Sequence, residues 1–234
     1  MVEDVTCRDL KEARLKTGLT QAQAAGALGV TQAYLSMLER GRREVSPGLL
    51  KRARQLMELR PTSLPLEAEP AAQVDSDELK AELGALGYPG FRYLVGKPAK
   101  NPAQLVFEAL GQGDLDVRVV EALPWLAANY ELDWKWLVPQ AKKHDRQNRL
   151  GFLVELAKEL ATKRQDDLRA GKLAETQEEL EHGRLVREDT LCHESMTNAE
   201  RRWLRQNRPE SATHWNLLTD LQLNNLSYAA RSSS

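Results

Sequence analysis

The feature that most constrains the fold of this chain is a glycine inside a helix-forming stretch. Residues 20–43 read TQAQAAGALGVTQAYLSMLERGRR, with Gly29 between two apolar residues and a Thr-Gln pair on either side. In one long helix this glycine would cost about 1 kcal/mol relative to alanine. A left-handed glycine that ends a helix carries no such penalty. The stretch therefore predicts two short helices, 21–28 and 32–40, that meet at a turn.

Capping residues begin both predicted helices. Thr20 and Gln23 form a capping-box pattern, in which each side chain bonds a free backbone N–H of the other residue. Thr31 is placed to cap the second helix, and Gly41 is placed to end it. If the two helices cross, their small and apolar side chains face a common core. These side chains are Ala24, Ala25, Leu28, Val30, Leu35 and Leu38.

Two further helices complete this unit. One spans residues 7–17 and ends at Gly18. The other begins at Ser46 and Pro47, because serine caps a helix and proline suits its first position, and it runs to about residue 59. The side chains expected to face the core are Leu10, Ala13, Leu15, Leu49, Leu50, Ala53 and Leu56.

Residues 8–59 resemble the Cro/C1-type (XRE-like) helix-turn-helix domain of phage repressors. The matching features are Thr20-Gln21, Ala25, Gly29, Val30, Leu35, Leu38 and the Leu-Glu-Arg-Gly run at 38–41. Ala24 and Gly26 depart from the family pattern. The resemblance implies a lambda-repressor-like domain of four to five helices that binds duplex DNA. It also implies a structural ion pair between Arg14 and Glu39.

In domains of this family the second helix of the motif enters the DNA major groove. Gln32 can bond adenine bidentately, and Ala33 and Met37 offer apolar contact to a thymine methyl. By the resemblance, Gln21 would brace Gln32 and touch a phosphate, while arginines after the helix suit backbone phosphates. Outside this motif, Gln32 would be read as an ordinary solvated position. The expected DNA-binding residues are Gln21, Thr31, Gln32, Ala33, Ser36, Met37, Arg42 and Arg43.

Composition predicts a soluble, cytoplasmic globular protein. The 234 residues suffice for one large domain or two smaller ones, and 41% are hydrophobic. No apolar run approaches the roughly 18 residues of a membrane span, and the first residues lack the features of a signal peptide. The two cysteines, Cys7 and Cys192, make no disulfide framework.

Charge is divided unevenly along the chain, although the net charge is only −1. Residues 1–60 contain 11 Lys and Arg against 7 Asp and Glu, whereas residues 75–234 contain 22 against 25. The positive end therefore coincides with the proposed DNA-binding domain. Its modest excess predicts few phosphate contacts per protomer, and a dimer would double them.

The remaining chain divides into a linker and a second helical region. Residues 61–74 hold three prolines and no apolar period, which is typical of a linker. Residues 75–230 are predicted to be helical, followed by a frayed tail at 231–234. Residues 91–96, FRYLVG, are the one stretch with strand character. Pro124 is expected to start or kink a segment, and a break is expected near Pro139. Expected helix starts in this region are Asp75, Asn101, Asp116, Asp133, Gln147, Thr197 and Ser211.

Aromatic residues mark the second region, and motifs for chemistry are missing from it. We expect the tryptophans to form a helical core, or alternatively to line a groove for a partner or ligand. Cys192-His193-Glu194 is the most compact set of potential metal ligands, but adjacent residues on a helix do not converge on one ion. The sequence thus predicts no metal, no cofactor and no enzymatic activity. The tryptophans are Trp125, Trp134, Trp136, Trp203 and Trp215.

The sequence as a whole predicts an all-α regulator of transcription. Residues 1–60 would bind double-stranded DNA, and residues 75–230 would form a homodimer or bind a partner. A single small DNA-binding domain buries little surface on DNA, so a dimer on a palindromic operator is expected. The alternative is an antitoxin-type module that neutralises a partner toxin and autoregulates its own operon. A third hypothesis is a small-molecule sensor with an effector pocket in the helical region.

Overall fold

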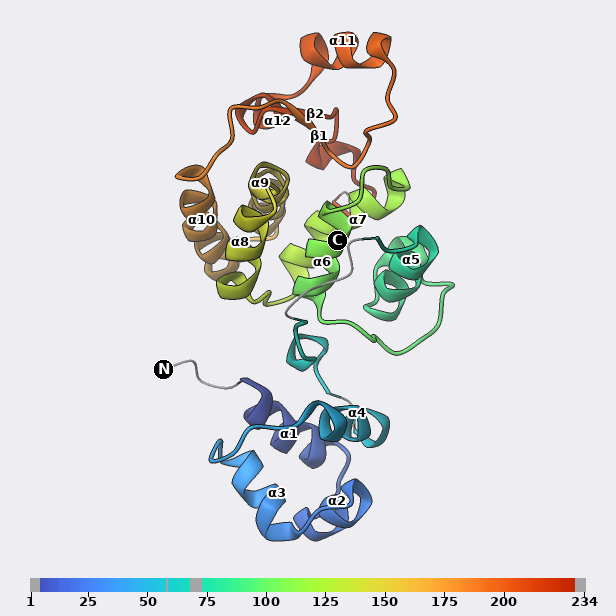
Figure 1. The fold of residues 1–234 in the computed structure, drawn as a ribbon, viewed down its shortest axis with the longest axis vertical. Coiled ribbons are helices and arrows are strands. Elements are labelled where there is room, and N and C mark those ends of the chain that lie inside the picture. Colours follow the sequence, from blue (N-terminus) through green and yellow to red (C-terminus); the bar gives the residue numbers. More distant parts are fainter. Residues whose placement is uncertain (1–4, 58, 68–72, 230–234) are drawn as a thin grey trace. The chain divides into compact units, whose positions relative to one another are not determined.

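The computed structural model describes residues 5–57, 59–67 and 73–229, and within them the fold is all-α apart from two short strands (Figure 1). The chain divides into two compact units. The first comprises the described part of Met1–Leu66 together with Ala99–Asn101, and the second comprises the remainder. The all-α fold with an N-terminal helix-turn-helix arrangement agrees with the prediction.

The second, third and fourth helices of the first unit begin at the predicted capping residues. The first helix begins at Val5, before the predicted residue 7, and the fourth ends at Leu56, before the predicted residue 59. Thr20 and Gln23 form the capping box, and the hydroxyls of Thr31 and Ser46 cap the helices that follow them. Local side chains fix these ends, because each satisfies a backbone N–H that the helix itself leaves unpaired. The elements are α1 (Val5–Lys16), α2 (Gln21–Leu28), α3 (Gln32–Glu39), α4 (Pro47–Leu56) and η1 (Pro61–Ser63).

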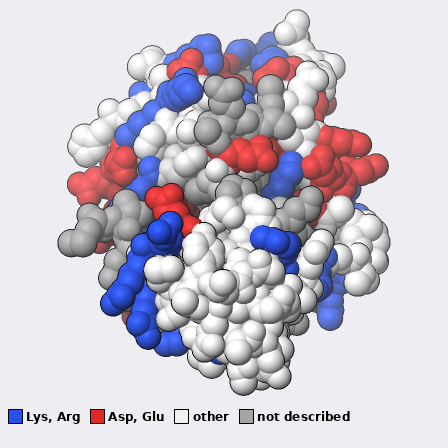
Figure 2. All heavy atoms as spheres, turned by 60° about the horizontal axis from the view of Figure 1, so that its bottom comes forward, with Lys and Arg blue, Asp and Glu red and all other residues white. Residues whose placement is uncertain are grey.

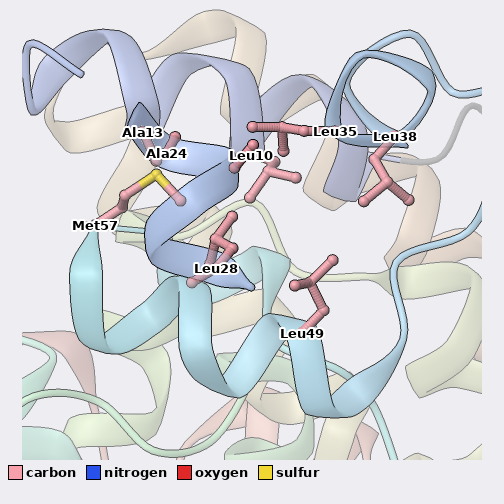
Figure 3. Packing of buried hydrophobic residues seen from close by; sticks show 10 residues of the cluster. Leu10, Ala13, Ala24, Leu28, Leu35, Leu38, Leu49 and Met57 are labelled. Atoms are coloured by element: carbon pink, nitrogen blue, oxygen red, sulfur yellow. The ribbon is translucent and has the colours of Figure 1, made fainter. Parts of the chain in front are cut away.

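The core of the first unit joins side chains from all four α-helices, which point toward one another in Figure 3. Two predicted core residues are instead exposed: Leu15 is 58% exposed and Leu56 is 42% exposed. On α1 the buried stripe contains Leu10, Ala13 and Arg14, so Leu15 points away from it. After Leu49 and Ala53, the next four-residue step falls on Met57. The core consists of Leu10, Ala13, Ala24, Ala25, Leu28, Leu35, Leu38, Leu49, Ala53 and Met57.

The expected linker begins later than predicted, because its first residues belong to the first unit. Ser63 and Leu64 are buried, and the Ser63 hydroxyl donates to the Arg60 carbonyl at 2.7 Å. The Asn101 amide donates to the carbonyl oxygens of Thr62 and Leu64, at 3.0 and 2.7 Å. The first unit therefore continues to Leu66 rather than ending at residue 60.

The second unit is built around α9, which packs against α7, α8 and α10 (Figure 1). The predicted stripe on α9 is buried, including Leu150, Val154 and Leu160. Predicted caps at Asp75, Asp116 and Asp133 and the capping box at Thr197 are present. The elements are α5 (Ser76–Ala85), η2 (Pro89–Phe91), α6 (Pro102–Leu110), α7 (Val117–Asn129), α8 (Trp134–Lys143), α9 (Gln147–Lys163), α10 (Asp167–Glu181), β1 (Asp189–Thr190), α11 (Asn198–Asn207), α12 (Glu210–His214), β2 (Leu217–Leu218) and η3 (Leu223–Asn225).

The predicted break near Pro139 is wrong, and Pro124 does not start a new helix. Helix α7 continues through Pro124, and α8 continues through Pro139. A proline inside a helix costs about 3 kcal/mol or more. On α7 the neighbouring Leu123, Trp125 and Leu126 are all buried, and their packing against the rest of the unit outweighs that cost.

The strand expectation and the last predicted helix also need correction. Residues 91–96 form no strand; Phe91 ends η2 and turns follow it. Instead, β1 and β2 pair in parallel, with Asp189 opposite Leu217. Ser211 is not the cap of a long helix, because α12 begins after Pro209 and ends at His214. The predicted tail at 231–234 lies outside the described residues.

The tryptophans divide between core and surface. Trp125 and Trp215 are buried, whereas Trp134 and Trp136 are half-buried. Trp203 on α11 is 54% exposed, so the prediction of a core position is wrong for this residue. Only Leu204 of α11 is buried among the residues of that helix, and this single contact point leaves the adjacent ring in solvent.

Candidate nucleic-acid interface

The turn between α2 and α3 depends on Gly29. Its backbone is left-handed, with φ 68° and ψ 36°, and its N–H donates to the Gly26 carbonyl at 3.1 Å. The Val30 N–H then donates to the Ala25 carbonyl at 3.0 Å. These bonds satisfy the carbonyls at the end of α2 while the chain reverses into α3.

Packing fixes which face of α3 points outward. Leu35 and Leu38 are fully buried on one side. On the other, Gln32 and Ala33 are exposed, and their neighbours one turn later, Ser36 and Met37, are half-buried. The outward face of α3 therefore carries one polar pair, Gln32 and Ser36, and one apolar pair, Ala33 and Met37.

An ion pair supports the helix pair from inside. Arg14 Nε donates to Glu39 Oε1 at 2.6 Å, and Arg14 Nη2 donates to Glu39 Oε2 at 3.1 Å. A further nitrogen of the same guanidinium donates to the Leu19 carbonyl at 3.0 Å. Both side chains are nearly excluded from solvent, and the hydrogen bond to Glu39 raises the pKa of Arg14. The pair therefore ties α1 to α3.

Gln21 does not brace Gln32 as the resemblance implied. Its amide donates to Glu39 Oε2 at 3.1 Å, and so completes the buried ion pair. Among the described residues, the Gln32 side chain has no hydrogen-bond partner. Its amide is thus available to a ligand.

The outward surface of α2 and α3 is almost free of charge. The two helices contain a single ionisable side chain that is charged at neutral pH, Glu39, and its charge is compensated internally by Arg14. Figure 2, which turns this end of the first unit toward the reader, shows a broad uncharged area with Lys and Arg side chains beside it. A neutral polar surface next to cations suits a duplex, whose base edges lie between charged backbones.

The arginines that directly follow α3 in the sequence are exposed to solvent. Arg42 and Arg43, the predicted phosphate contacts, follow the left-handed Gly41 and are solvent-exposed, as is Arg40. Thr31 has a structural role, since its hydroxyl accepts from the Tyr34 N–H at 3.1 Å. The predicted set thus contains two supporting residues, Gln21 and Thr31, and two half-buried ones, Ser36 and Met37. The exposed members are Gln32, Ala33, Arg42 and Arg43.

Sequence reasoning missed one cation at the turn. A Cβ added to Gly29 would lie 3.3 Å from Nη1 of Arg52, so this α4 guanidinium lies directly beside the α2–α3 turn. The signal for Arg52 was the basic run KRAR at 51–54, which reads as a solvated face when no tertiary contact is known.

The possible metal ligands of the second unit point to different partners. The Cys192 thiol is buried and donates to the Ala109 carbonyl at 3.4 Å, whereas Glu194 accepts from Arg149 at 3.3 Å. No group of three or more His, Cys, Asp or Glu side chains within the described ranges is arranged to hold a metal ion. In the same part of the chain, every helix is too short or too polar to cross a membrane.

Residues 10–64 match the helix-turn-helix family. The match covers less than a quarter of the chain and includes the α2–α3 turn, the buried ion pair and the outward face of α3. Comparisons with curated proteins and with solved structures found no match.

Proposed function

We propose that this protein, whose residues 10–64 are a helix-turn-helix domain of the Cro/C1 type, binds a specific DNA sequence as a homodimer and regulates transcription from it. Domains of this type bind DNA in transcription regulation. The outward residues of α3 would read base edges, and the arginines after it would contact phosphates. Binding alone accounts for this function, so the proposal includes neither enzymatic activity nor a cofactor, and it assigns the protein to the cytoplasm.

The observation that carries the proposal is the outward face of α3. Gln32 is exposed and its amide has no partner within the described structure. An amide donor and acceptor matches N6 and N7 of adenine in the major groove. Ala33 and Met37 beside it offer apolar contact to a thymine methyl. This face therefore combines one specific hydrogen-bonding group with an apolar surface, which suits direct reading of bases.

The test is the base preference of Gln32→Ala. Operators are first selected from random duplexes with the unmodified chain, and the affinity of both proteins for single-base variants is then measured at fixed salt. We expect Gln32→Ala to lose about 1–3 kcal/mol of binding free energy and to relax the preference at one position per half-site.

Gln55→Ala is the matched control, because Gln55 is an exposed glutamine of the same unit on α4. We expect it to leave both affinity and base preference unchanged. If Gln32→Ala retains the full preference of the unmodified chain, the assignment of Gln32 to base reading is wrong even if the protein binds DNA.

The homodimer is inferred from the small size of the DNA-binding domain. A single module buries about 600–1,000 Å² of protein surface on DNA, which is little for tight specific binding. Two copies related by a two-fold axis would read half-sites spaced by about one helical turn. Sedimentation of the free chain and the symmetry of the selected operators test this directly, since a monomer on an asymmetric site contradicts it.

A second candidate function is binding of a protein partner, such as a toxin, through the second unit. The observation that favours it is Trp203, because an exposed tryptophan is typical of interface hot spots. Co-expression with the product of the neighbouring gene, followed by purification, tests it. Loss of the complex in Trp203→Ala but not in Trp134→Ala would support this function, and the absence of any complex would exclude that product as the partner.

A further inference from the structure

The second unit contains a cavity that neither the helix-turn-helix domain nor DNA binding requires. It has a volume of about 150 Å³ and is partly open to solvent. Its walls come from the first turns of α7, from residues 191–196, from α11 and from the segment that contains β2. The lining is largely aliphatic and includes Val117, Val120, Leu191, Met196, Leu204 and Leu218.

Hydrogen bonds hold the walls of this cavity in place. The Leu115 N–H donates to the Cys192 carbonyl at 3.0 Å, and the Glu194 N–H donates to the Gly113 carbonyl at 2.9 Å. These bonds join two segments far apart in the sequence on one side of the cavity. On another side, Arg205 of α11 donates to Glu188 at 2.7 Å, which ties α11 to the chain before β1.

The polar lining is sparse and consists of Cys192, His193, Thr219 and Asp220. His193 is exposed. Asp220 is exposed and has no hydrogen-bond or ion-pair partner within the described residues. The Cys192 thiol is buried and already donates to the Ala109 carbonyl. The hydroxyl of Thr219 accepts from the Leu221 N–H at 3.2 Å. Asp220 is thus the lining residue with a negative charge available to a ligand.

We propose that this cavity binds a small apolar amine, with its hydrocarbon body among the aliphatic side chains and its ammonium group at Asp220. A cavity of about 150 Å³ has room for a single benzene ring. A free carboxylate at the edge of such a cavity favours a cation over a neutral molecule or an anion. The site lies entirely within the second unit, so its existence does not depend on whether the first unit binds DNA.

Three single-ring probes test separately the binding of a hydrocarbon ring in the cavity and the preference for an ammonium group at Asp220. The full chain is titrated with benzylamine, toluene and benzoate, and binding is followed by NMR and calorimetry. We expect saturable binding of benzylamine, with an affinity about two- to fivefold higher than that of toluene, as an exposed ion pair adds only modestly. Benzoate should bind most weakly, because its carboxylate meets Asp220.

Variants assign the binding to this cavity. Val117 lines it yet is 66% exposed, so Val117→Trp fills the cavity from its edge without disturbing the core. We expect benzylamine to bind about tenfold more weakly to this variant. Val95→Trp is the matched control, because Val95 is 98% exposed and does not line the cavity. Asp220→Asn should remove the preference for benzylamine over toluene and leave toluene binding intact.

Two results would overturn the proposal. One is the absence of saturable binding by both benzylamine and toluene to the folded chain. The other is equal benzylamine affinity in Val117→Trp, Val95→Trp and the unmodified protein, which would locate the ligand elsewhere. Should Val117→Trp fail to fold, as judged by far-UV circular dichroism, the Asp220→Asn comparison still decides whether this carboxylate selects the amine. Operator binding is measured separately, so its failure is distinguishable from loss of the cavity ligand.

Discussion

Glu39 is a charged residue held inside the first unit by three donated hydrogen bonds, two from Arg14 and one from Gln21. Removing its carboxylate would leave the Arg14 guanidinium buried without its counter-ion. We therefore expect Glu39→Ala to cost about 3–5 kcal/mol of the stability of this unit. Hydrogen exchange of the full chain measures the effect, as a loss of protection confined to peptides from α1 to α4.

The matched control is another glutamate of the same unit with an arginine partner. Glu12 accepts from Arg60 at 2.6 Å, but both side chains are about half exposed. An exposed pair contributes about 0–1 kcal/mol, so Glu12→Ala should leave protection nearly unchanged. Equal effects of Glu39→Ala and Glu12→Ala would show that burial of the Arg14–Glu39 pair does not stabilise the unit.

Residue-scale features were predictable where their partner is near in sequence. Thr20 caps α2 through Gln23, three residues later, and that bond follows from local geometry alone. The partner of Gln21 was not predictable, because Glu39 lies 18 residues away and on another helix. Arg52 was missed for the same reason, since its place beside Gly29 depends on how α4 packs.

At the scale of elements, helix starts were better predicted than helix interruptions. Asp116 and Asp133 begin α7 and α8 as expected, because a cap acts within one turn. Pro124 and Pro139 did not end those helices, because the packing of neighbouring side chains outweighs a local penalty. The β1–β2 pair escaped prediction altogether, since two-residue strands carry no periodic signal.

Gly151 lies inside α9, where helix propensity alone would favour alanine, but its close packing against another side chain disfavours a larger residue. A Cβ at this position would overlap the ring of Trp215, which is fully buried and whose Nε1 donates to Glu155 at 2.7 Å. Alanine gains about 1 kcal/mol in an unstrained helix, whereas overpacking costs about 1–3 kcal/mol. We expect Gly151→Ala to destabilise the second unit, as measured by urea unfolding followed by tryptophan fluorescence, because all five tryptophans lie in that unit.

Gly171→Ala in α10 is the matched control for Gly151→Ala, because it changes helix propensity without adding a steric overlap. Gly171 is exposed and a Cβ there meets open space. We expect it to stabilise the same unit by about 0.4–1 kcal/mol, so the two alanine variants should differ in sign. Stabilisation by Gly151→Ala would mean that α9 and Trp215 adjust freely around an added methyl group.

At the scale of the whole molecule, the helix-turn-helix match coincides with the positively charged part of the chain. The positive excess lies in residues 1–60 and the negative excess in residues 75–234. The motif therefore located the helix-turn-helix domain, which residues 10–64 match, without a structure. Composition and motif did not locate the cavity of the second unit, because its walls combine α7, α11 and β2, which meet only through the tertiary fold.

Salt dependence distinguishes phosphate contacts from base contacts in this molecule. Each phosphate contact contributes about −0.9 to the slope of log K against log salt concentration. Arg42 is exposed just after α3, so Arg42→Ala should reduce the steepness of this slope by about 0.9 per protomer and weaken binding to all duplexes similarly. Gln32→Ala should leave the slope unchanged while it alters base preference. Arg92 is an exposed arginine of the second unit, and Arg92→Ala should change neither quantity.

The quantity to measure is affinity for a selected operator and for an unrelated duplex across a salt series. A slope that is the same in Arg42→Ala and the unmodified chain would remove Arg42 from the interface, and an equal reduction in Arg92→Ala would mean that total charge, rather than the position of Arg42, governs binding.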